Sequence, residues 1–410
     1  MLTQTLSEKS TYHLDLEDKH GAHNYHPIPV VIERGKGVFV WDVDGKRYYD
    51  FLSAYSALNQ GHCHPRIVGK LVEQAQKLTL TSRAFFNNTM GEFAKYITEY
   101  FGYDKVLPSN GGAEGVESAI KLARRWGYVK KGIPEGKAKM IVCEKNFHGR
   151  TTTVISFSSD PSAYTNFGPL TPGFEKIPYN DLVALEKALQ DENVCGFLFE
   201  PIQGEAGVVV PDEGYLAGVR QLCNEYNVLM VADEIQTGLA RTGKILACDH
   251  EDVRPDILIL GKALSGGTIP VAVVLADDYI MLNIKPGEHG STYGGNALAC
   301  VVTMEALQVL KDENMAENAE AMGILLRAEL AKLQSPFIKT IRGKGLLNAV
   351  VVNHPNPEAA WDLCVALKEN GLLAKPTHGD KIRFAPPLCI TREQILECVE
   401  IIGRSLKTLG

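Results

Sequence analysis

Residues 256–270 have the sequence Asp-Ile-Leu-Ile-Leu-Gly-Lys-Ala-Leu-Ser-Gly-Gly-Thr-Ile-Pro, and this stretch decides how the chain folds. Its apolar run, Ile257–Leu260, predicts a short strand of a parallel sheet, because both faces are apolar and the run is too short for a helix. Lys262 follows this buried strand, and glycines on either side let the backbone approach a ligand closely. The position suits an amine that is held rigidly and spends time as a neutral nucleophile, although an ordinary lysine at a strand end also fits it.

Other apolar runs repeat this pattern. Met140–Cys143, Gly196–Phe199 and Val228–Ala232 predict buried strands that each end in polar residues, and helical patterns occupy Ala184–Leu189 and Leu216–Tyr226. The alternation predicts an α/β fold with a mainly parallel sheet flanked by helices. Ligands of such sheets bind beyond the carboxyl ends of the strands, so we expect one shared ligand site there.

The segments that follow these strands contain candidate binding residues. They are Asn146–Thr151, Glu200–Glu205 and Asp233–Gly238. In the first, Phe147 offers a ring to a flat ligand and Arg150 offers a planar fork to a carboxylate. A packed phenylalanine and a solvated arginine are the commoner interpretation of such residues.

A glycine pair predicts an anion site. Gly111 and Gly112 lie in the segment Ser109–Glu114, directly before a helical pattern at residues 116–123. The free N–H groups and the dipole of a helix N-terminus attract a phosphate. The Gly-Lys-Ser/Thr ending of a nucleotide-binding P-loop is missing, so the signal is weak when taken alone.

Together these elements fit one cofactor, pyridoxal 5′-phosphate. Lys262 would form an imine with it, Asp233 would keep its pyridine nitrogen protonated, and Phe147 would stack on its ring. The helix N-terminus that begins near Gly112 would bind its phosphate.

Composition excludes several classes of protein. The chain has 410 residues, 45% of them hydrophobic and 22% charged, which is typical of a globular protein of two domains. A net charge of -7 argues against nucleic-acid and anionic-membrane partners, and no apolar run is long enough to span a membrane. Acidic residues near the start fit no signal or transit peptide, and nine unpaired cysteines suggest reduced thiols. We therefore expect a cytoplasmic protein whose mature chain starts here.

Two segments resemble metal sites but favour other interpretations. Gly61–Pro65 places two histidines around a cysteine, yet adjacent residues point in different directions and no second cluster completes a ligand set. Asp42–Gly45 resembles the start of a calcium loop, but the apolar segments that flank it, Val38–Trp41 and Arg47–Phe51, predict a hairpin turn. We predict no metal.

The last third of the chain has a different pattern. Long helical patterns at 297–310 and 315–333 precede a predicted strand at 346–352, a helix near 357–369 and a final amphipathic helix at about 391–406. This indicates a smaller α/β domain. We expect an N-terminal segment (1–55), a large cofactor-binding domain (56–285) and a small C-terminal domain (286–410).

These motifs, in this order, resemble the class III pyridoxal-phosphate-dependent aminotransferases and, within them, those that act on ornithine. The resemblance covers nearly the whole chain. Its motifs are Gly-Ala-His-Asn-Tyr (21–25), Ser-Ala-Tyr-Ser-Ala-Leu-Asn-Gln-Gly-His (53–62), Glu-Pro-Ile-Gln-Gly-Glu-Ala-Gly (200–207), Asp-Glu-Ile-Gln-Thr-Gly (233–238), Leu-Gly-Lys-Ala-Leu-Ser-Gly-Gly (260–267) and His-Gly-Ser-Thr-Tyr-Gly-Gly-Asn (289–296).

The resemblance implies a fold-type I enzyme, an obligate homodimer with shared active sites, and a role for each cofactor-binding residue. Lys262 carries the cofactor, Asp233 faces the pyridine nitrogen and Gln236 bonds the phenolic oxygen. Backbone N–H groups of Gly112 and Ala113 bind the phosphate, with Thr292 reaching it from the partner subunit. The chain departs from the family at Gly111, where a threonine or serine is usual, and at Ala297, where proline is usual.

The resemblance also implies the reaction. The δ-amine of ornithine passes to 2-oxoglutarate, giving glutamate 5-semialdehyde and glutamate. Tyr25, Tyr55 and Arg150 then surround the α-amino acid end of ornithine, while Glu205 pairs with Arg383 and releases it to grip a carboxylate of 2-oxoglutarate. Alternatives are a relative that uses N-acetylornithine or 4-aminobutyrate, and a non-catalytic protein that only binds the cofactor.

Overall fold

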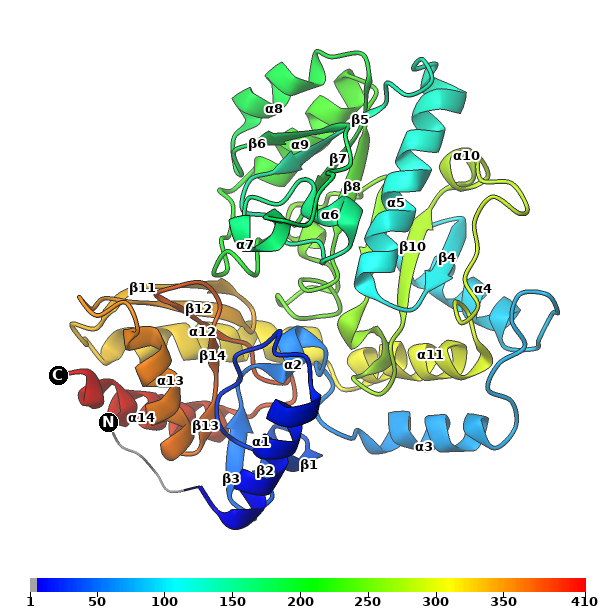
Figure 1. Cartoon of the computed structure of the whole chain (residues 1–410). Coiled ribbons are helices and arrows are strands. Elements are labelled where there is room, and N and C mark those ends of the chain that lie inside the picture. The colour runs from blue at the N-terminus through cyan, green and yellow to red at the C-terminus, as the bar shows by residue number, and fades with distance from the viewer. Residues whose placement is uncertain (1–5) are drawn as a thin grey trace.

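The computed structural model describes residues 6–410, and a seven-stranded sheet forms the centre of its larger part (Figure 1). The strand order is β4-β10-β9-β8-β7-β5-β6. All pairings are parallel except those of β10, which runs antiparallel to both of its neighbours. The strands are β4 (Lys105–Ser109), β5 (Lys139–Cys143), β6 (Phe174–Ile177), β7 (Val194–Phe199), β8 (Leu229–Asp233), β9 (Ile257–Leu260) and β10 (Ala272–Ala276). The predicted mainly parallel sheet is confirmed.

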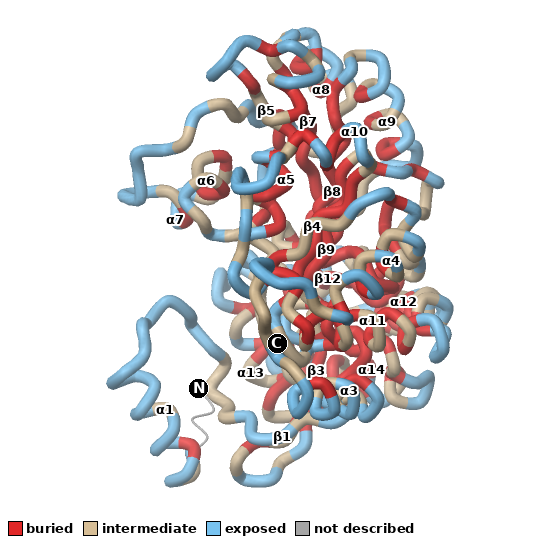
Figure 2. The backbone as a smooth tube through the Cα atoms, turned by 90° about the vertical axis from the view of Figure 1, so that its right-hand side faces the viewer, coloured by how far each residue is buried: buried red, intermediate tan, exposed pale blue. Residues whose placement is uncertain are grey.

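Helices cover both faces of this sheet because its strands are apolar on both sides. Met140 and Val142 of β5 pack in a cluster with α5 (Gly112–Trp126), whereas Ile141 and Cys143 pack on the other face with α8 (Leu182–Leu189) and α9 (Tyr215–Glu225). Alternate residues of a strand point to opposite faces, so each face contributes its own core. Figure 2 shows these central strands as a buried band through the larger part of the molecule.

The C-terminal part has its own antiparallel sheet, in the order β11-β12-β15-β14. We call it the small sheet. Its strands are β11 (Ile338–Lys344), β12 (Leu347–Val352), β14 (Lys375–Pro376) and β15 (Lys381–Phe384), and the helices of this part are α12 (Met315–Lys332), α13 (Ala359–Glu369) and α14 (Arg392–Leu406). A third sheet pairs strands from both ends of the chain, β1 (Ile32–Lys36), β2 (Phe39–Asp42), β3 (Arg47–Asp50) and β13 (Leu372–Leu373). Because β13 lies beside β3, the N-terminal strands belong structurally with the C-terminal part, and the domain boundaries at residues 55 and 285 stay predictions.

The hairpin predicted around Asp42–Gly45 is confirmed, since β2 and β3 pair antiparallel across it.

Long helices connect the two parts: α11 (Ala297–Asp312) packs against α3 (Pro65–Ala75) and α4 (Met90–Phe101). The remaining elements are α1 (Glu8–His20), α2 (Ser53–Ser56), α6 (Thr152–Ile155), α7 (Pro161–Tyr164), α10 (Asp278–Met281), η1 (Gly127–Lys131), η2 (Ala247–Glu251), η3 (Lys262–Ser265) and η4 (Lys407–Leu409).

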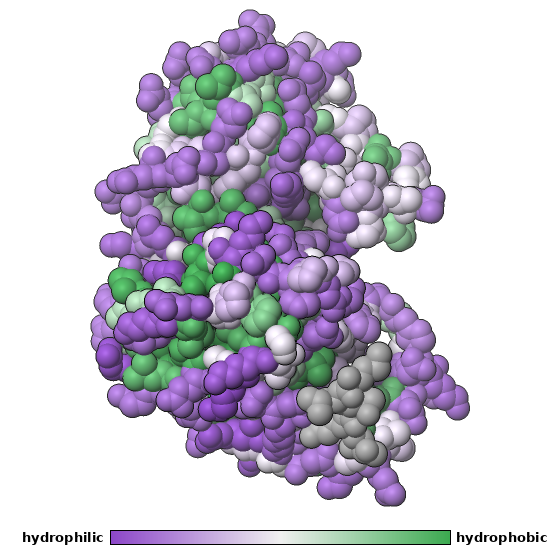
Figure 3. All heavy atoms as spheres, turned by 90° about the vertical axis from the view of Figure 1, so that its left-hand side faces the viewer, coloured by the Kyte–Doolittle hydropathy of each residue, from purple (hydrophilic) through white to green (hydrophobic). Residues whose placement is uncertain are grey.

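The surface is mostly hydrophilic on the face drawn in Figure 3, which is indented between its upper and lower parts. Within residues 6–410, no helix combines the length and the apolar character that crossing a membrane requires. The same residues contain no group of three or more histidine, cysteine, aspartate or glutamate side chains arranged to hold a metal ion.

The two histidines of Gly61–Pro65 have structural partners instead. His62 Nε2 lies 2.8 Å from Asp50 Oδ2, and His64 Nε2 lies 2.9 Å from Glu313 Oε1.

Candidate active site

Lys262 stands directly after β9, as the sequence predicts, with its backbone in the left-handed region (φ 46°). A non-glycine residue in this region is strained and persists only when its surroundings fix it. Burial lowers the pKa of Lys262, and Arg383 adds to this, while the carboxylates of Glu205 and Asp233 work in the opposite direction. Because burial penalises the ammonium form, the site favours a neutral, nucleophilic amine.

Gln60 holds the loop after Lys262 through a hydrogen bond to its backbone. The side-chain amide of Gln60 is buried and donates to the carbonyl oxygens of Ala263 and Ala306, each 3.2 Å away. Gly266 has φ 62°, and a Cβ there would collide with the side chain of Ile67. The chain before α3 therefore holds the Lys262 loop in its strained conformation.

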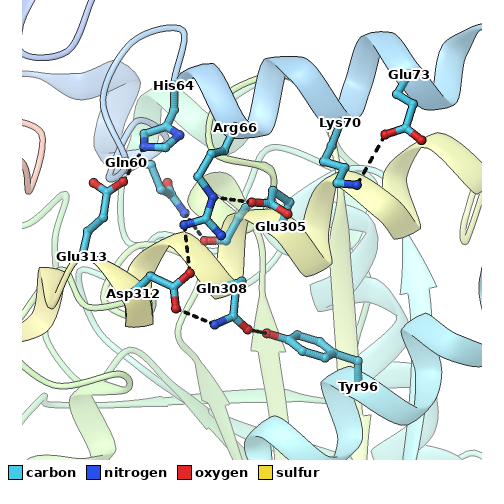
Figure 4. A network of polar contacts seen from close by, with 11 residues as sticks. Gln60, His64, Arg66, Lys70, Glu73, Tyr96, Glu305, Gln308, Asp312 and Glu313 are labelled. Carbon is cyan, nitrogen blue, oxygen red and sulfur yellow. Dashed lines mark hydrogen bonds and ion pairs between the residues drawn. The ribbon is translucent and has the colours of Figure 1, made fainter.

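Arg66 of α3 fixes this support to α11, as Figure 4 shows. Its Nε lies 2.7 Å from Glu305 Oε1 and its Nη1 lies 2.8 Å from Asp312 Oδ2. Arg66 thus links α3 to α11, and the Ala306 carbonyl oxygen of α11 also accepts a hydrogen bond from Gln60.

Asp233 ends β8 and pairs with a histidine that the sequence analysis did not single out. His148 Nδ1 lies 2.7 Å from Asp233 Oδ2, and both side chains are buried. Burial alone would lower the pKa of His148, but the hydrogen bond and negative charge of Asp233 outweigh it, and the pKa of His148 is raised. The hydrogen bond from His148 fixes the orientation of the Asp233 carboxyl group, which lines the inner cavity of the site.

Glu200, at the end of β7, is a second buried acid of the site. It accepts hydrogen bonds from the backbone N–H groups of Phe147, at 2.9 Å, and Gly204, at 3.2 Å. Burial raises the pKa of Glu200 to about 7, with His148 lowering it and Asp233 raising it further. Glu200 thus links the segment after β5 to the segment after β7.

These groups line an inner cavity of about 190 Å³. Its lining residues are Gly112, Ala113, Phe147, His148, Gly149, Glu200, Glu205, Asp233, Ile235, Gln236, Thr237 and Lys262. Gly112 and Ala113 begin α5, and the first N–H groups of a helix have no partner within the helix. A Cβ on Gly112 would lie 3.0 Å from Ile235, so the glycine keeps the helix end open.

The inner cavity therefore fits pyridoxal phosphate. Its wall combines an amine, a buried carboxylate and the N-terminus of a 15-residue helix, which match the aldehyde, the ring nitrogen and the phosphate of this cofactor. His148 Nε2 is buried and has no partner among the described residues.

An outer cavity of about 460 Å³ adjoins the inner one and shares Phe147, His148, Gly149 and Glu205 with it. Arg150 lines this outer cavity, with its guanidinium carbon 5.7 Å from the centroid of the Phe147 ring. The predicted carboxylate-binding arginine thus stands beside the space that leads to Lys262.

Glu205 and Arg383 form the predicted ion pair. Arg383 Nη1 lies 2.7 Å from Glu205 Oε1 and 3.2 Å from Gln236 Oε1, and the arginine is completely buried. Burial opposes the charge of Glu205, but Arg383 and Lys262 outweigh it and lower the pKa of Glu205. Two nitrogens of Arg383, Nε and Nη2, have no partner among the described residues, so the guanidinium retains donors for a carboxylate.

Tyr55 also reaches this pair, with its ring centroid 5.2 Å from the guanidinium carbon of Arg383. It belongs to the turn Ser53–Ser56, in which every residue has a positive φ. Such a left-handed turn without glycine costs about 1–2 kcal/mol per residue, so the surrounding contacts must impose it.

Four of the predicted site residues line neither cavity of this chain. Tyr55 and Arg383 contact each other as just described, whereas Tyr25 and Thr292 are exposed. Tyr25 is 71% exposed, and the centroid of its ring lies 5.8 Å from Lys375 Nζ. The predicted roles of Tyr25 and Thr292, the second of which involves a partner subunit, stay predictions.

Comparisons with known proteins agree with this geometry. A family model described as "Aminotransferase class-III" matches residues 20–406. The mitochondrial ornithine aminotransferase of Rattus norvegicus is 61% identical over 97% of this chain and 90% of its own length. A crystal structure of the ornithine aminotransferase of Toxoplasma gondii has a TM-score of 0.95 at 50% identity, covering 98% of this chain and 96% of its own. That of an acetylornithine aminotransferase from Elizabethkingia anophelis has a TM-score of 0.90 at 59% identity, covering 97% and 99%.

Proposed function

Because this chain belongs to the class III aminotransferase family, we propose that it transfers the δ-amino group of L-ornithine to 2-oxoglutarate, with pyridoxal 5′-phosphate as cofactor. The products are L-glutamate 5-semialdehyde and L-glutamate. The observation that carries the proposal is the Glu205–Arg383 pair in the same site as Lys262. An enzyme that alternates between a substrate end without a carboxylate and one with a carboxylate needs an arginine that can be masked and unmasked.

The bound cofactor supplies a carbonyl that condenses with amines and a ring that accepts electrons. Lys262 would hold the cofactor, and its amine would move a proton from the δ-carbon of the substrate as general base and acid. Its lowered pKa suits this role, since a neutral amine is present at a higher fraction. Asp233, oriented by its hydrogen bond with His148, would face the ring nitrogen of the cofactor and favour its protonated form.

Glu205 decides which end of the substrate approaches Lys262. In the first half-reaction it neutralises Arg383, and Arg150, with Tyr25 and Tyr55, holds the α-amino acid end of ornithine, so that the δ-amine reaches the cofactor. In the second half-reaction Glu205 leaves Arg383, whose free guanidinium binds a carboxylate of 2-oxoglutarate. The Glu205–Arg383 pair would therefore let one site bind both ornithine and 2-oxoglutarate.

A visible-range spectrum tests the proposal. Adding ornithine to the yellow enzyme should bleach the cofactor band, and 2-oxoglutarate should restore it. A spectrum that does not respond to ornithine would refute the proposed donor.

N-acetylornithine is the second candidate donor, because the protein from Elizabethkingia anophelis, 59% identical to this chain, is named an acetylornithine aminotransferase. An acetylated α-amine loses the charge and hydrogen bonds that Tyr25 and Tyr55 would offer, and it is bulkier. We expect a preference for ornithine of roughly thirty- to a thousandfold in kcat/KM over N-acetylornithine and 4-aminobutyrate. Equal or better use of N-acetylornithine would overturn the assignment.

We also propose a homodimer with shared active sites. Its support is the exposure of large aromatic side chains, among them Phe85, Phe86 and Tyr293, of which Phe86 is 99% exposed. Large exposed aromatic side chains are typical of surfaces that a partner covers. Analytical ultracentrifugation tests this, and an active monomer would refute it.

For the compartment we propose the cytoplasm, supported by nine free cysteines, most of them buried. The relative from Rattus norvegicus is named mitochondrial, so fractionation of cells that express the chain is the direct test.

A further inference from the structure

Glu205 lies on a tight hairpin, residues 203–209, which we call the Glu205 hairpin. Its ends are joined by two backbone hydrogen bonds between Gln203 and Val209, and the N–H groups of Gly207 and Val208 both donate to the carbonyl of Gly204. Val208 has φ 55°. This conformation is strained for a β-branched residue, so contacts outside the hairpin must hold it in place.

One such contact is an apolar cluster that joins the hairpin to the small sheet. Ile202 and Val208 pack with Leu347 and Ala349 of β12 and with Ala385, and all five are buried. The hairpin follows β7 of the seven-stranded sheet along the chain, but it packs against the small sheet.

Two polar contacts join the tip of the hairpin to the same sheet. Arg342 Nε of β11 donates to the carbonyl oxygen of Gly207 at 2.8 Å, and Arg383 of β15 pairs with Glu205 at 2.7 Å. Gly207 has φ 94°, and a Cβ there would collide with the side chain of Lys381. The tip therefore lies directly on the small sheet.

The two polar contacts are not equivalent under the proposed function, on which this inference rests. The Glu205–Arg383 pair exists only while the amine donor is processed and is broken when 2-oxoglutarate takes the arginine. The Arg342–Gly207 hydrogen bond uses a backbone carbonyl, so nothing in the switch removes it. We propose that Arg342 is a positioning residue that keeps the Glu205 hairpin on the small sheet while Glu205 is away from Arg383.

The test is Arg342→Gln in the full holoenzyme, with each half-reaction followed separately in single turnovers. With ornithine, the ion pair still holds the tip, so the apparent dissociation constant should rise by a smaller factor than with 2-oxoglutarate, even though Arg342 also lines the outer cavity. With 2-oxoglutarate, Arg342 is the remaining polar contact, and loss of one hydrogen bond should weaken binding roughly three- to tenfold. Lys339→Gln removes a charge from the exposed side of the same strand and is the matched control, expected to stay within twofold in both half-reactions.

A second variant distinguishes positioning from general damage. In Glu205→Ala the pair is absent throughout, so adding Arg342→Gln should now weaken both half-reactions by a similar factor. Arg342→Lys, which keeps a donor, should recover part of the effect. Equal effects of Arg342→Gln on both half-reactions in the presence of Glu205, or no effect on either, would overturn the inference.

Amide hydrogen exchange provides a readout that does not need turnover. In Arg342→Gln the N–H groups of Val208 and Val209 should exchange at least threefold faster with 2-oxoglutarate bound, while protection of β12 is unchanged. Unchanged exchange at the hairpin would also overturn the inference. Failure of the wild-type enzyme to react with ornithine would instead refute the proposed function, so the two outcomes are distinguishable.

Discussion

Replacing Glu205 by glutamine should change the substrate preference of the enzyme and lower its stability. The change removes the negative charge next to Arg383, which has no exposed surface. Removing one partner of a buried ion pair costs about 3–5 kcal/mol. Gln236 Oε1, 3.2 Å from Arg383, and the ring of Tyr55 still stabilise the charge of Arg383. We therefore expect a loss of about 2 kcal/mol, which corresponds to roughly thirtyfold in an equilibrium constant.

Because the charge of Arg383 is no longer masked, the two half-reactions should be affected differently. An unmasked Arg383 attracts the α-carboxylate of ornithine and places the wrong amine at the cofactor, so kcat/KM for ornithine should fall about thirtyfold. For 2-oxoglutarate kcat/KM should be equal to that of wild type or higher, because no ion pair has to break. Steady-state kinetics with both substrates varied measures the two values. A kcat/KM for ornithine within twofold of wild type, with an unchanged ratio between the substrates, would refute the switch.

Three further predictions concern individual residues. The pKa of Glu200 is raised from 4.5 to about 7, so the folded chain binds more protons than the unfolded chain between these values and stability falls as pH rises through them. The Tm of Glu200→Gln relative to wild type should therefore rise from pH 5 to pH 8, and a constant difference would contradict this. A methyl group in Gly204→Ala would occupy the place of the Gln236 amide, at a cost of about 1–3 kcal/mol, visible as a lower Tm and weaker cofactor binding. Tyr25→Phe should lower kcat/KM for ornithine about tenfold and leave 4-aminobutyrate unaffected, and an unchanged ornithine value would exclude Tyr25 from the site.

Local patterns in the sequence predicted the main sheet and the position of Lys262. Ile257–Leu260 and Lys262 are contiguous, and a four-residue apolar run followed by a glycine carries the information for a buried strand that ends at a ligand site. The glycine pair before α5 was predictable for the same reason. The antiparallel direction of β10 was not, because the direction of a strand depends on its connection and not on its own residues.

The contacts that complete the site join segments far apart in the sequence. His148, which follows β5, reaches Asp233 at the end of β8 past the intervening strand β7, and Arg342 of the small sheet reaches Gly207 in the segment after β7. His148 lies in a polar segment after a predicted strand, and this was the only local signal that could have indicated it. The Glu205–Arg383 pair was predicted through the family resemblance, since no spacing rule connects these two residues. Tyr25 and Thr292 came from the same source and lie outside the cavities of this chain.

The most direct test of the account is the identity of the lysine that carries the cofactor. The holoenzyme is treated with borohydride, which fixes the cofactor covalently to its lysine, and is then digested and mapped by mass spectrometry. The label should lie on Lys262 alone, and Lys262→Ala should take up no label while remaining folded by circular dichroism. A label on any other lysine, or a labelled Lys262→Ala variant, would contradict the central claim.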